Sequence, residues 1–109
     1  MAATLVATAT YEKRISRLLP PCDRRAMEDA IAWNPDAHPV VPGTAGVRKA
    51  RWGRLGMGKR GGIRVIYYWL AAPDLVLLIT AYAKNAKENL SDADKAYIRR
   101  IVADFRRRG

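Results

Sequence analysis

The sequence predicts an α+β fold: a small, largely antiparallel sheet with two N-terminal helices on one face and a C-terminal helix. Segments rich in β-branched residues and segments with helical periodicity follow one another in the order β-α-α-β-β-β-α. A helical pair packed on one face of such a sheet is the simplest arrangement that buries the apolar sides of both. The 109 residues show no repeat and no second domain, so we expect a single domain over residues 1–109.

The N-terminal third is expected to hold one strand and two helices. The stretch "TLVATAT" (residues 4–10) is rich in β-branched residues and predicts the strand. Thr10 is expected to cap the first helix, which a pair of prolines ends. Asp23 is expected to cap the second helix, which ends at Asn34. Residues 35–46 are rich in Pro and Gly and predict a loop. The apolar faces of the two helices carry Tyr11, Ile15, Leu18 and Leu19, and Met27, Ala30 and Ile31.

Three strands and a helix are expected in the rest of the chain. The strands are Val47–Trp52, Gly61–Ala71 and Asp74–Ala83, with Pro73-Asp74 as the tight turn before the last one. That last strand is apolar on both faces, which is typical of a buried central strand. Ser91-x-x-Asp94 resembles a capping box with Asp in place of Glu, and it predicts the start of the final helix. The apolar face of this helix carries Tyr97, Ile98, Ile101, Val102 and Phe105.

The strong positive charge of the chain points to a polyanionic partner. Lys and Arg outnumber Asp and Glu by 20 to 10, which gives a net charge of +10 and an isoelectric point near 10.4. Nucleic acid is the commonest such partner. A membrane surface is the competing interpretation, but it usually requires a basic amphipathic helix or a lipid anchor. An acidic protein partner is a further possibility, and the two modes of binding can coexist.

Cysteine content and hydropathy favour a cytoplasmic protein that does not bind membranes. Cys22 is the single cysteine, so no internal disulfide can form, which favours a reducing compartment. The start "MAATLVATATYEKR" lacks the basic region and the sustained apolar region of a signal peptide. The longest apolar run, near Val65–Ile79, is interrupted by Pro73 and Asp74 and is too short to span a bilayer.

The stretch "GRLGMGKRGG" (residues 53–62) resembles a phosphate-binding P-loop at first sight. The pattern Gly53-x-x-x-x-Gly58-Lys59 fits, but Arg60 stands where a P-loop needs Ser or Thr. A P-loop also leads from a strand into a helix, whereas the next segment, "IRVIYYW", favours a strand. We therefore interpret this stretch as the connection of a β-hairpin.

The predicted hairpin carries positive charge only. No acidic residue occurs between Ala37 and Pro73, and solvated faces normally mix both signs of charge. Strand alternation places Lys49 and Arg51 on one face of their strand. Arg64 lies inside an apolar strand, where it either extends to water or a carboxylate, or joins those two cations to bind a phosphate. The cations of the stretch are Arg48, Lys49, Arg51, Arg54, Lys59, Arg60 and Arg64.

The segment after the last strand, "YAKNAKENLS", adds two more candidates. Lys84 and Lys87 come just after the strand end, where they either complete a cationic rim or are ordinary loop lysines. His38 is the only histidine of the chain, which excludes a ribonuclease that works with paired histidines. No metal site or cofactor is expected from these residues.

Three blocks together resemble the RelE/ParE superfamily of bacterial type II toxins, and most closely its HigB-like branch. They are "GTAGVRKARW", "GKRGGIRVIYYWL" and "ITAYAKNAKENLS", and the similarity covers nearly the whole chain. The resemblance implies a small β-sheet toxin neutralised by a co-expressed antitoxin, expected to carry a helix-turn-helix domain. RelE-type members of this superfamily enter the ribosomal A site and cut the mRNA there.

The resemblance also assigns roles to individual residues. Lys49 and Arg51 match the basic strand residues of the family, Arg64 matches its strand arginine, and Lys84 falls among the cations after the last strand. Asn85 stands near the place of a second arginine in the best-known members, and no tyrosine matches their C-terminal one. The expected catalytic residues are Lys49, Arg51, Arg64 and Lys84, and the expected RNA-binding residues are Arg48, Arg54, Lys59, Arg60 and Lys87.

Cations in this arrangement suit the cleavage of RNA by its own 2′-hydroxyl group. They stabilise the charge that develops on the phosphorane, and Arg64 can hold the phosphate through two parallel hydrogen bonds. A lysine crowded by other cations can take up or give a proton. The leading hypothesis is therefore a ribosome-dependent, metal-independent mRNA endonuclease that inhibits translation. A gyrase inhibitor of the ParE type and a non-catalytic protein that binds RNA or blocks the ribosome are the alternatives.

Overall fold

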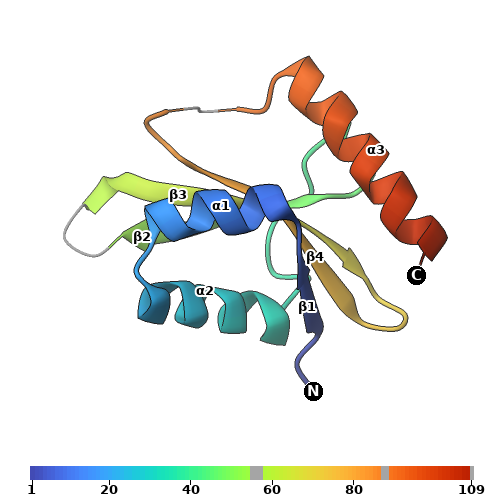
Figure 1. The fold of residues 1–109 in the computed structure, drawn as a ribbon, viewed down its shortest axis with the longest axis horizontal. Helices are drawn as coiled ribbons and strands as arrows, with labels where there is room; N and C mark the ends of the chain where they lie inside the picture. The colour runs from blue at the N-terminus through green and yellow to red at the C-terminus, as the bar shows by residue number, and fades with distance from the viewer. Residues whose placement is uncertain (55–57, 87–88, 109) are drawn as a thin grey trace.

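The computed structural model describes residues 1–54, 58–86 and 89–108, and it contains the predicted elements in the predicted order (Figure 1). Three helices and one four-stranded sheet make up the fold, which confirms the α+β class. The elements are β1 (Thr4–Ala7), α1 (Ala9–Leu18), α2 (Pro21–Trp33), β2 (Arg48–Arg54), β3 (Gly58–Leu70), β4 (Leu75–Ala83) and α3 (Asp92–Arg108).

The sheet has the strand order β1-β4-β3-β2. β4 pairs antiparallel with β3 and parallel with β1, while β2 pairs antiparallel with β3 at the edge of the sheet. A residue inserted between the pairs Ile66–Thr80 and Tyr67–Leu78 shifts the register of β3 and β4. The central position of β4 explains its uninterrupted apolar sequence, because residues 76–82 are all buried.

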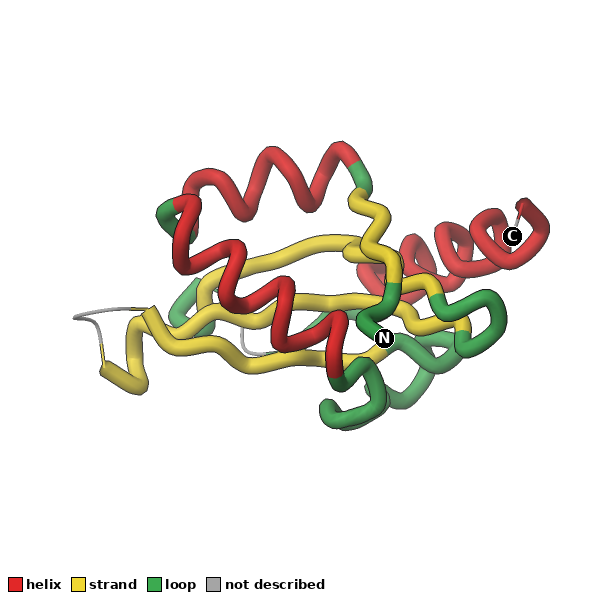
Figure 2. Tube along the Cα trace, turned by 90° about the horizontal axis from the view of Figure 1, so that it is seen from below, coloured by secondary structure: helices red, strands yellow, loops and turns green. Residues whose placement is uncertain are grey.

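The helices cover the two faces of the sheet unequally. Figure 2 shows α1 and α2 over one face of the sheet, whereas α3 lies apart from them, at the right of the view. Tyr11 and Ile15 of α1 and Met27 of α2 pack with Val65 and Leu78 in the larger core. A second core on the opposite face joins α3 to β3 and β4 through Ile66, Tyr68, Ile79, Ile98 and Val102. One end of that opposite face carries the cations described below.

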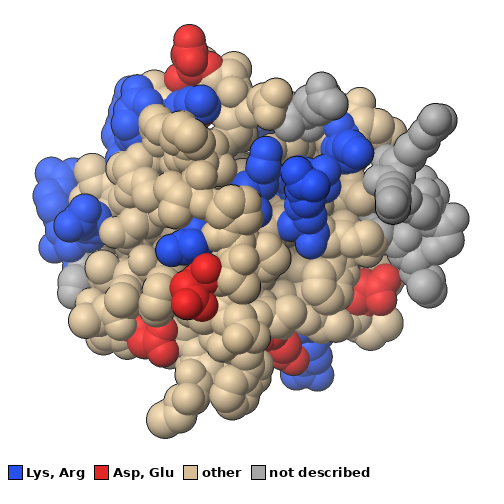
Figure 3. All heavy atoms as spheres, turned by 180° about the vertical axis from the view of Figure 1, so that it is seen from behind, with Lys and Arg blue, Asp and Glu red and all other residues tan. Residues whose placement is uncertain are grey.

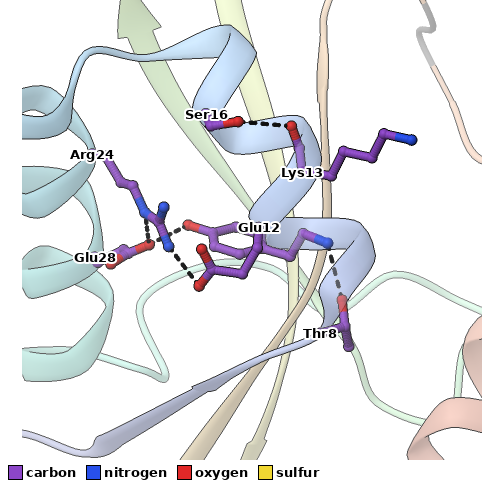
Figure 4. A network of polar contacts seen from close by, with 7 residues as sticks. Thr8, Glu12, Lys13, Ser16, Arg24 and Glu28 are labelled. Atoms are coloured by element: carbon purple, nitrogen blue, oxygen red, sulfur yellow. Dashed lines mark hydrogen bonds and ion pairs between the residues drawn. The ribbon is translucent and has the colours of Figure 1, made fainter.

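A polar cluster joins the two N-terminal helices (Figure 4). The Arg24 guanidinium of α2 donates to Glu12 of α1 at 2.7 Å and to Glu28 at 2.8 Å. The Tyr11 hydroxyl donates to the same Glu28 carboxylate at 2.6 Å. Burial, followed by this hydrogen bond, raises the pKa of Tyr11 far above its ordinary value, so the hydroxyl remains a donor. The pair α1–α2 is thus fixed as one layer.

Two helix starts differ from the sequence prediction. Thr8, not Thr10, caps α1: its hydroxyl accepts from the Tyr11 N–H at 3.0 Å and donates to the Ile79 carbonyl at 2.6 Å. That contact with β4 fixes where the strand ends and the helix begins. Helix α2 begins at Pro21 and has no side-chain cap. Proline suits the first helical position, since it has no N–H group that would need a partner there. Asp23 lies in the first turn instead of capping it.

Helix α3 has the predicted start but a narrower apolar face. Ser91 and Asp94 exchange backbone-to-side-chain hydrogen bonds of 3.0 and 3.1 Å, which confirms the capping box. Ile98 and Val102 are buried, whereas Tyr97 is 48% exposed, so its assignment to the core face was wrong. The second core is narrow, and a residue about 100° around the helix from Ile98 lies outside it. Within the described residues, no helix has the length and apolar character needed to cross a membrane.

Candidate active site

Four predicted catalytic residues line one pocket of about 370 Å³ at the end of the sheet. Lys49 and Arg51 come from β2, Arg64 comes from β3, and Lys84 lies in the turn after β4. Asn89, which precedes α3, completes the lining. Residues 35 positions apart in the sequence therefore meet in one cavity, which we call the cationic pocket.

Strand pairing explains how the cations meet. Arg51 lies directly opposite Arg64 in the β2–β3 register, and Lys49 is two residues along the same strand. Residues two apart on a strand share a face, so Lys49 and Arg51 point to the same side as Arg64. Ala50, between them, is buried in the core below α1 and α2. The backbone N–H of Lys84 donates to the Gly62 carbonyl at 3.0 Å, which holds this turn beside β3.

Arg64 is the least exposed cation of the pocket. It is 8% exposed, and its Nη1 donates to the Ile63 carbonyl at 3.2 Å. A guanidinium has five N–H donors, so one backbone contact leaves most of them available to a ligand. A charge held this far from water interacts with an anion more strongly than a solvated one. The position therefore suits a phosphate group.

The electrostatic character of the pocket is uniformly positive. In the parts of the chain that the structure describes, no carboxylate forms an ion pair with any of the four cations, and none lines the pocket. Figure 3 shows one group of Lys and Arg side chains above and to the right of the middle of the face turned away from α1 and α2, with no acidic side chain within that group. Positive groups arranged in this way attract and orient an anionic ligand.

Arg48 lies on the other face of β2 from the pocket. It is the register partner of Tyr67, which belongs to the larger core. Its Nη1 donates to the carbonyls of Asp36 and His38, at 3.1 and 2.7 Å, and so holds the loop of residues 35–46 against the sheet. Burial, and then the Arg48 charge, lower the pKa of His38. The RNA-binding role expected for Arg48 remains a prediction, beside this structural one.

The other predicted RNA-binding residues lie in segments that the structure describes only in part. Arg54, Lys59 and Arg60 lie in the hairpin formed by β2 and β3, and Arg54 pairs with Gly58. Their side chains, and the whole of Lys87, lie outside the described structure. The hairpin itself is confirmed, since β3 and not a helix follows the glycine-rich stretch. The P-loop interpretation is therefore excluded by the fold as well as by the sequence.

Two residues near the cations were not singled out from the sequence. Asn89 lines the pocket, and Tyr82 lies directly opposite Arg64 in the β3–β4 register. Burial raises the pKa of Tyr82; the positive charge of Arg64 opposes that rise, and Asp94 adds to it. Strand alternation could have placed Tyr82 on one face of β4. It could not have placed Tyr82 opposite Arg64, because the inserted residue shifts the pairing of β4 with β3.

The described residues contain no group of three or more His, Cys, Asp or Glu side chains that could hold a metal ion. The groups that the pocket offers to a ligand are therefore ammonium, guanidinium and amide donors.

The fold agrees with what comparisons with known proteins show. Residues 41–108 match the model of a family described as the RelE toxin of the RelE/RelB toxin–antitoxin system. A solved structure of E. coli toxin RelE, an arginine-to-alanine double mutant in the free state, is similar with a TM-score of 0.56. The two are 19% identical, and the similarity covers 81% of this chain and 90% of that one.

The family match places this chain among the toxins of toxin–antitoxin systems. The chain belongs to the RelE toxin family, as its sequence blocks predicted. The partner of such a toxin is an antitoxin. Assignment to the HigB-like branch within the superfamily remains a prediction.

Proposed function

We propose that this protein is an endoribonuclease that cleaves mRNA on the ribosome and so inhibits translation. The observation that carries the proposal is the cationic pocket, in which Arg64 is nearly buried and no described carboxylate is present. A pocket of this kind suits a phosphodiester, which is negatively charged and becomes more so at the transition state. Membership of the RelE family supports the same activity.

The reaction that fits these groups is attack of a ribose 2′-hydroxyl on the adjacent phosphorus. The 2′-O–P bond forms, the P–O5′ bond breaks, a proton leaves the 2′-hydroxyl and a proton reaches the 5′-oxygen. Arg64 holds two phosphate oxygens through its planar guanidinium, and Arg51 beside it adds charge where the phosphorane forms. Lys49 and Lys84 are the groups of the pocket that can exchange protons.

Dependence on the ribosome follows from what the pocket lacks. Its described lining holds neither an imidazole nor a carboxylate, the groups that most often act as a general base. Alignment of the 2′-hydroxyl with the phosphorus must then supply a large part of the acceleration. A ribosome that holds the mRNA in a fixed conformation provides that alignment. Free RNA should accordingly be cut slowly.

The proposed cellular setting is the cytoplasm, where the toxin meets ribosomes and its antitoxin. A chain of net charge +10 favours an antitoxin with an acidic or amphipathic docking segment. We further propose that the antitoxin has a helix-turn-helix domain. Co-expression should then give a stable complex whose rate of formation falls with added salt.

A reconstituted translation reaction tests the proposal. The purified toxin is added to ribosomes that carry a defined mRNA, and the mRNA ends are mapped with time, while gyrase supercoiling is measured in parallel. We expect new mRNA ends within the codon in the A site and unchanged supercoiling. Inhibited supercoiling with intact mRNA would instead identify a ParE-type activity. Blocked translation with neither effect would identify a protein that binds the ribosome without catalysis.

A further inference from the structure

A second groove continues from the cationic pocket along the edge of the sheet. It has a volume of about 340 Å³ and shares Lys49, Arg51 and Asn89 with that pocket. A volume of about 300 Å³ or more is typical of sites that enclose a small ligand. Residues 39–42 form one wall, and Leu90 and Lys95 complete the lining. Because the two cavities share three residues, an RNA strand bound in the first can extend directly into the second.

The wall formed by residues 39–42 is apolar and exposed. It consists of Pro39, Val40, Val41 and Pro42, and Val40 is 49% exposed. Exposed apolar surface next to cations suits a ligand with a flat apolar part and a negative part. A nucleotide has both, because its base packs on apolar side chains while its phosphate requires a cation. Lys95 provides such a cation in the lining of the same groove.

The same wall is held rigidly against the rest of the fold. The Val41 N–H donates to Val47 at 2.8 Å, the Lys49 N–H donates to Pro39 at 3.1 Å, and Arg99 of α3 donates to the Gly43 carbonyl at 2.6 Å. Two prolines restrict the backbone further. A surface already fixed in shape loses little conformational entropy on binding, so it can favour one ligand geometry over another.

Backbone pairing makes a peptide a poor occupant of this wall. β2 is the edge strand, and a peptide would most readily add to it as a further strand. Residues 39–41 already cover that edge at Val47 and Lys49, and Val40 forms a bridge with Arg48. Pro39 and Pro42 offer no N–H donors. Side-chain contacts and charge are what remain, and they favour a nucleotide.

We infer that this groove binds the nucleotide next to the phosphate held in the cationic pocket, with its base against residues 39–42 and its outer phosphate on Lys95. The inference rests on RNA being the substrate in the proposed function. The groove is then the part of the protein that influences which base is accepted beside the cleaved bond, because it is where a base contacts side chains.

Binding and cleavage by surface variants test this site. Equilibrium binding of a short single-stranded RNA is measured against salt for wild type, Val40→Ser and Lys95→Ala. Val6→Ser is the matched control, since Val6 is also exposed, at 40%, but lies on β1 at the other edge of the sheet. We expect Val40→Ser to weaken binding several-fold without changing the salt dependence. Lys95→Ala should weaken binding and lower the slope against salt by about 0.7.

Mapped mRNA ends from the reconstituted ribosome reaction provide the second measurement. Val40→Ser should change the distribution of bases beside the cut, while Val6→Ser should not. Both groove variants behaving as wild type in binding and in cut positions would overturn the inference while leaving the cleavage activity in place. Wild type that binds RNA but cuts no mRNA would contradict the proposed function alone. Groove variants that bind RNA normally but lose the antitoxin would assign the groove to the antitoxin and also overturn the inference.

Discussion

Arg51 and Arg64 lie directly opposite each other on neighbouring strands, where two positive charges repel. Like charges in such a cross-strand pair lower stability, by an amount comparable to the gain from opposite charges, about 0.2–1 kcal/mol. No described carboxylate forms an ion pair with either residue. A pair arranged in this way disfavours folding and favours binding of an anion, which is typical of functional sites.

Replacing Arg51 should therefore separate stability from activity. We expect Arg51→Thr, which keeps a good strand former, to leave the melting temperature unchanged or raise it, because the repulsion is removed. Cleavage of mRNA on the ribosome should fall at least about tenfold, since one phosphate contact is lost. Thermal unfolding and cleavage rates measure the two effects. Arg100→Ala, an exposed change on α3, is the control. A destabilised Arg51→Thr protein would show that Arg51 is structural.

Arg64 should be the residue whose loss costs most activity. Arg64→Ala removes the planar contact with the phosphate, and loss of one such donor typically lowers the rate by about 10²–10³. Arg64→Lys retains the charge without the planar geometry and should recover activity only in part. Cleavage rates and thermal stability of all three proteins are the measurement. A folded Arg64→Ala protein that cleaves at the wild-type rate would exclude Arg64 from the active site.

The β2–β3 hairpin should bind ribosomal RNA by charge and not by sequence. The double change Lys59→Ala with Arg60→Ala removes two cations and should weaken ribosome association and reduce its dependence on salt. Sedimentation with ribosomes over a range of salt concentrations measures both. Arg106→Ala with Arg108→Ala removes the same charge from the end of α3 and serves as the control. Equal ribosome affinity in wild type and the hairpin variant would refute this role.

The cluster around Arg24 should contribute measurably to stability. Arg24→Ala removes hydrogen bonds to two carboxylates and leaves Glu28 half-buried without its cation, so we expect a loss of about 1–2 kcal/mol in the free energy of unfolding. Urea unfolding gives the value. Arg107→Ala removes a largely exposed ion pair with Asp104 and should change stability very little. If both changes cost the same, the Arg24 cluster adds nothing beyond an ordinary surface pair.

Stability should fall on acidification because of His38. Its pKa is lowered from 6.5 in the folded protein, mainly by burial, so the unfolded chain binds the proton more readily. Between the folded and unfolded pKa values the free energy of unfolding therefore decreases as the pH falls. Urea unfolding at about pH 7.5 and about pH 5.5 should show this decrease in wild type and a smaller one in His38→Gln. An equal decrease in both proteins would rule out His38 as its source.

Local patterns in the sequence determined the elements of this protein. Strand alternation placed Lys49 and Arg51 on one face and Ala50 on the other, and helical spacing identified Ile98 and Val102 as core residues. The capping box at Ser91 and the cationic hairpin were also predictable. These features depend on neighbours only a few residues away, so the order of residues specifies them directly.

Tertiary structure alone decided which distant residues meet. Thr8 begins α1 because its hydroxyl contacts Ile79, 71 residues away, and Tyr97 is exposed because the sheet buries only a narrow side of α3. Tyr82 lies opposite Arg64 only through the register of β3 and β4, which an inserted residue shifts. Arg48 anchors the loop of residues 35–46 only because that loop folds back against β2, where the Asp36 and His38 carbonyls accept hydrogen bonds from its guanidinium. Contacts over such separations depend on strand pairing and packing, which no short stretch of sequence contains.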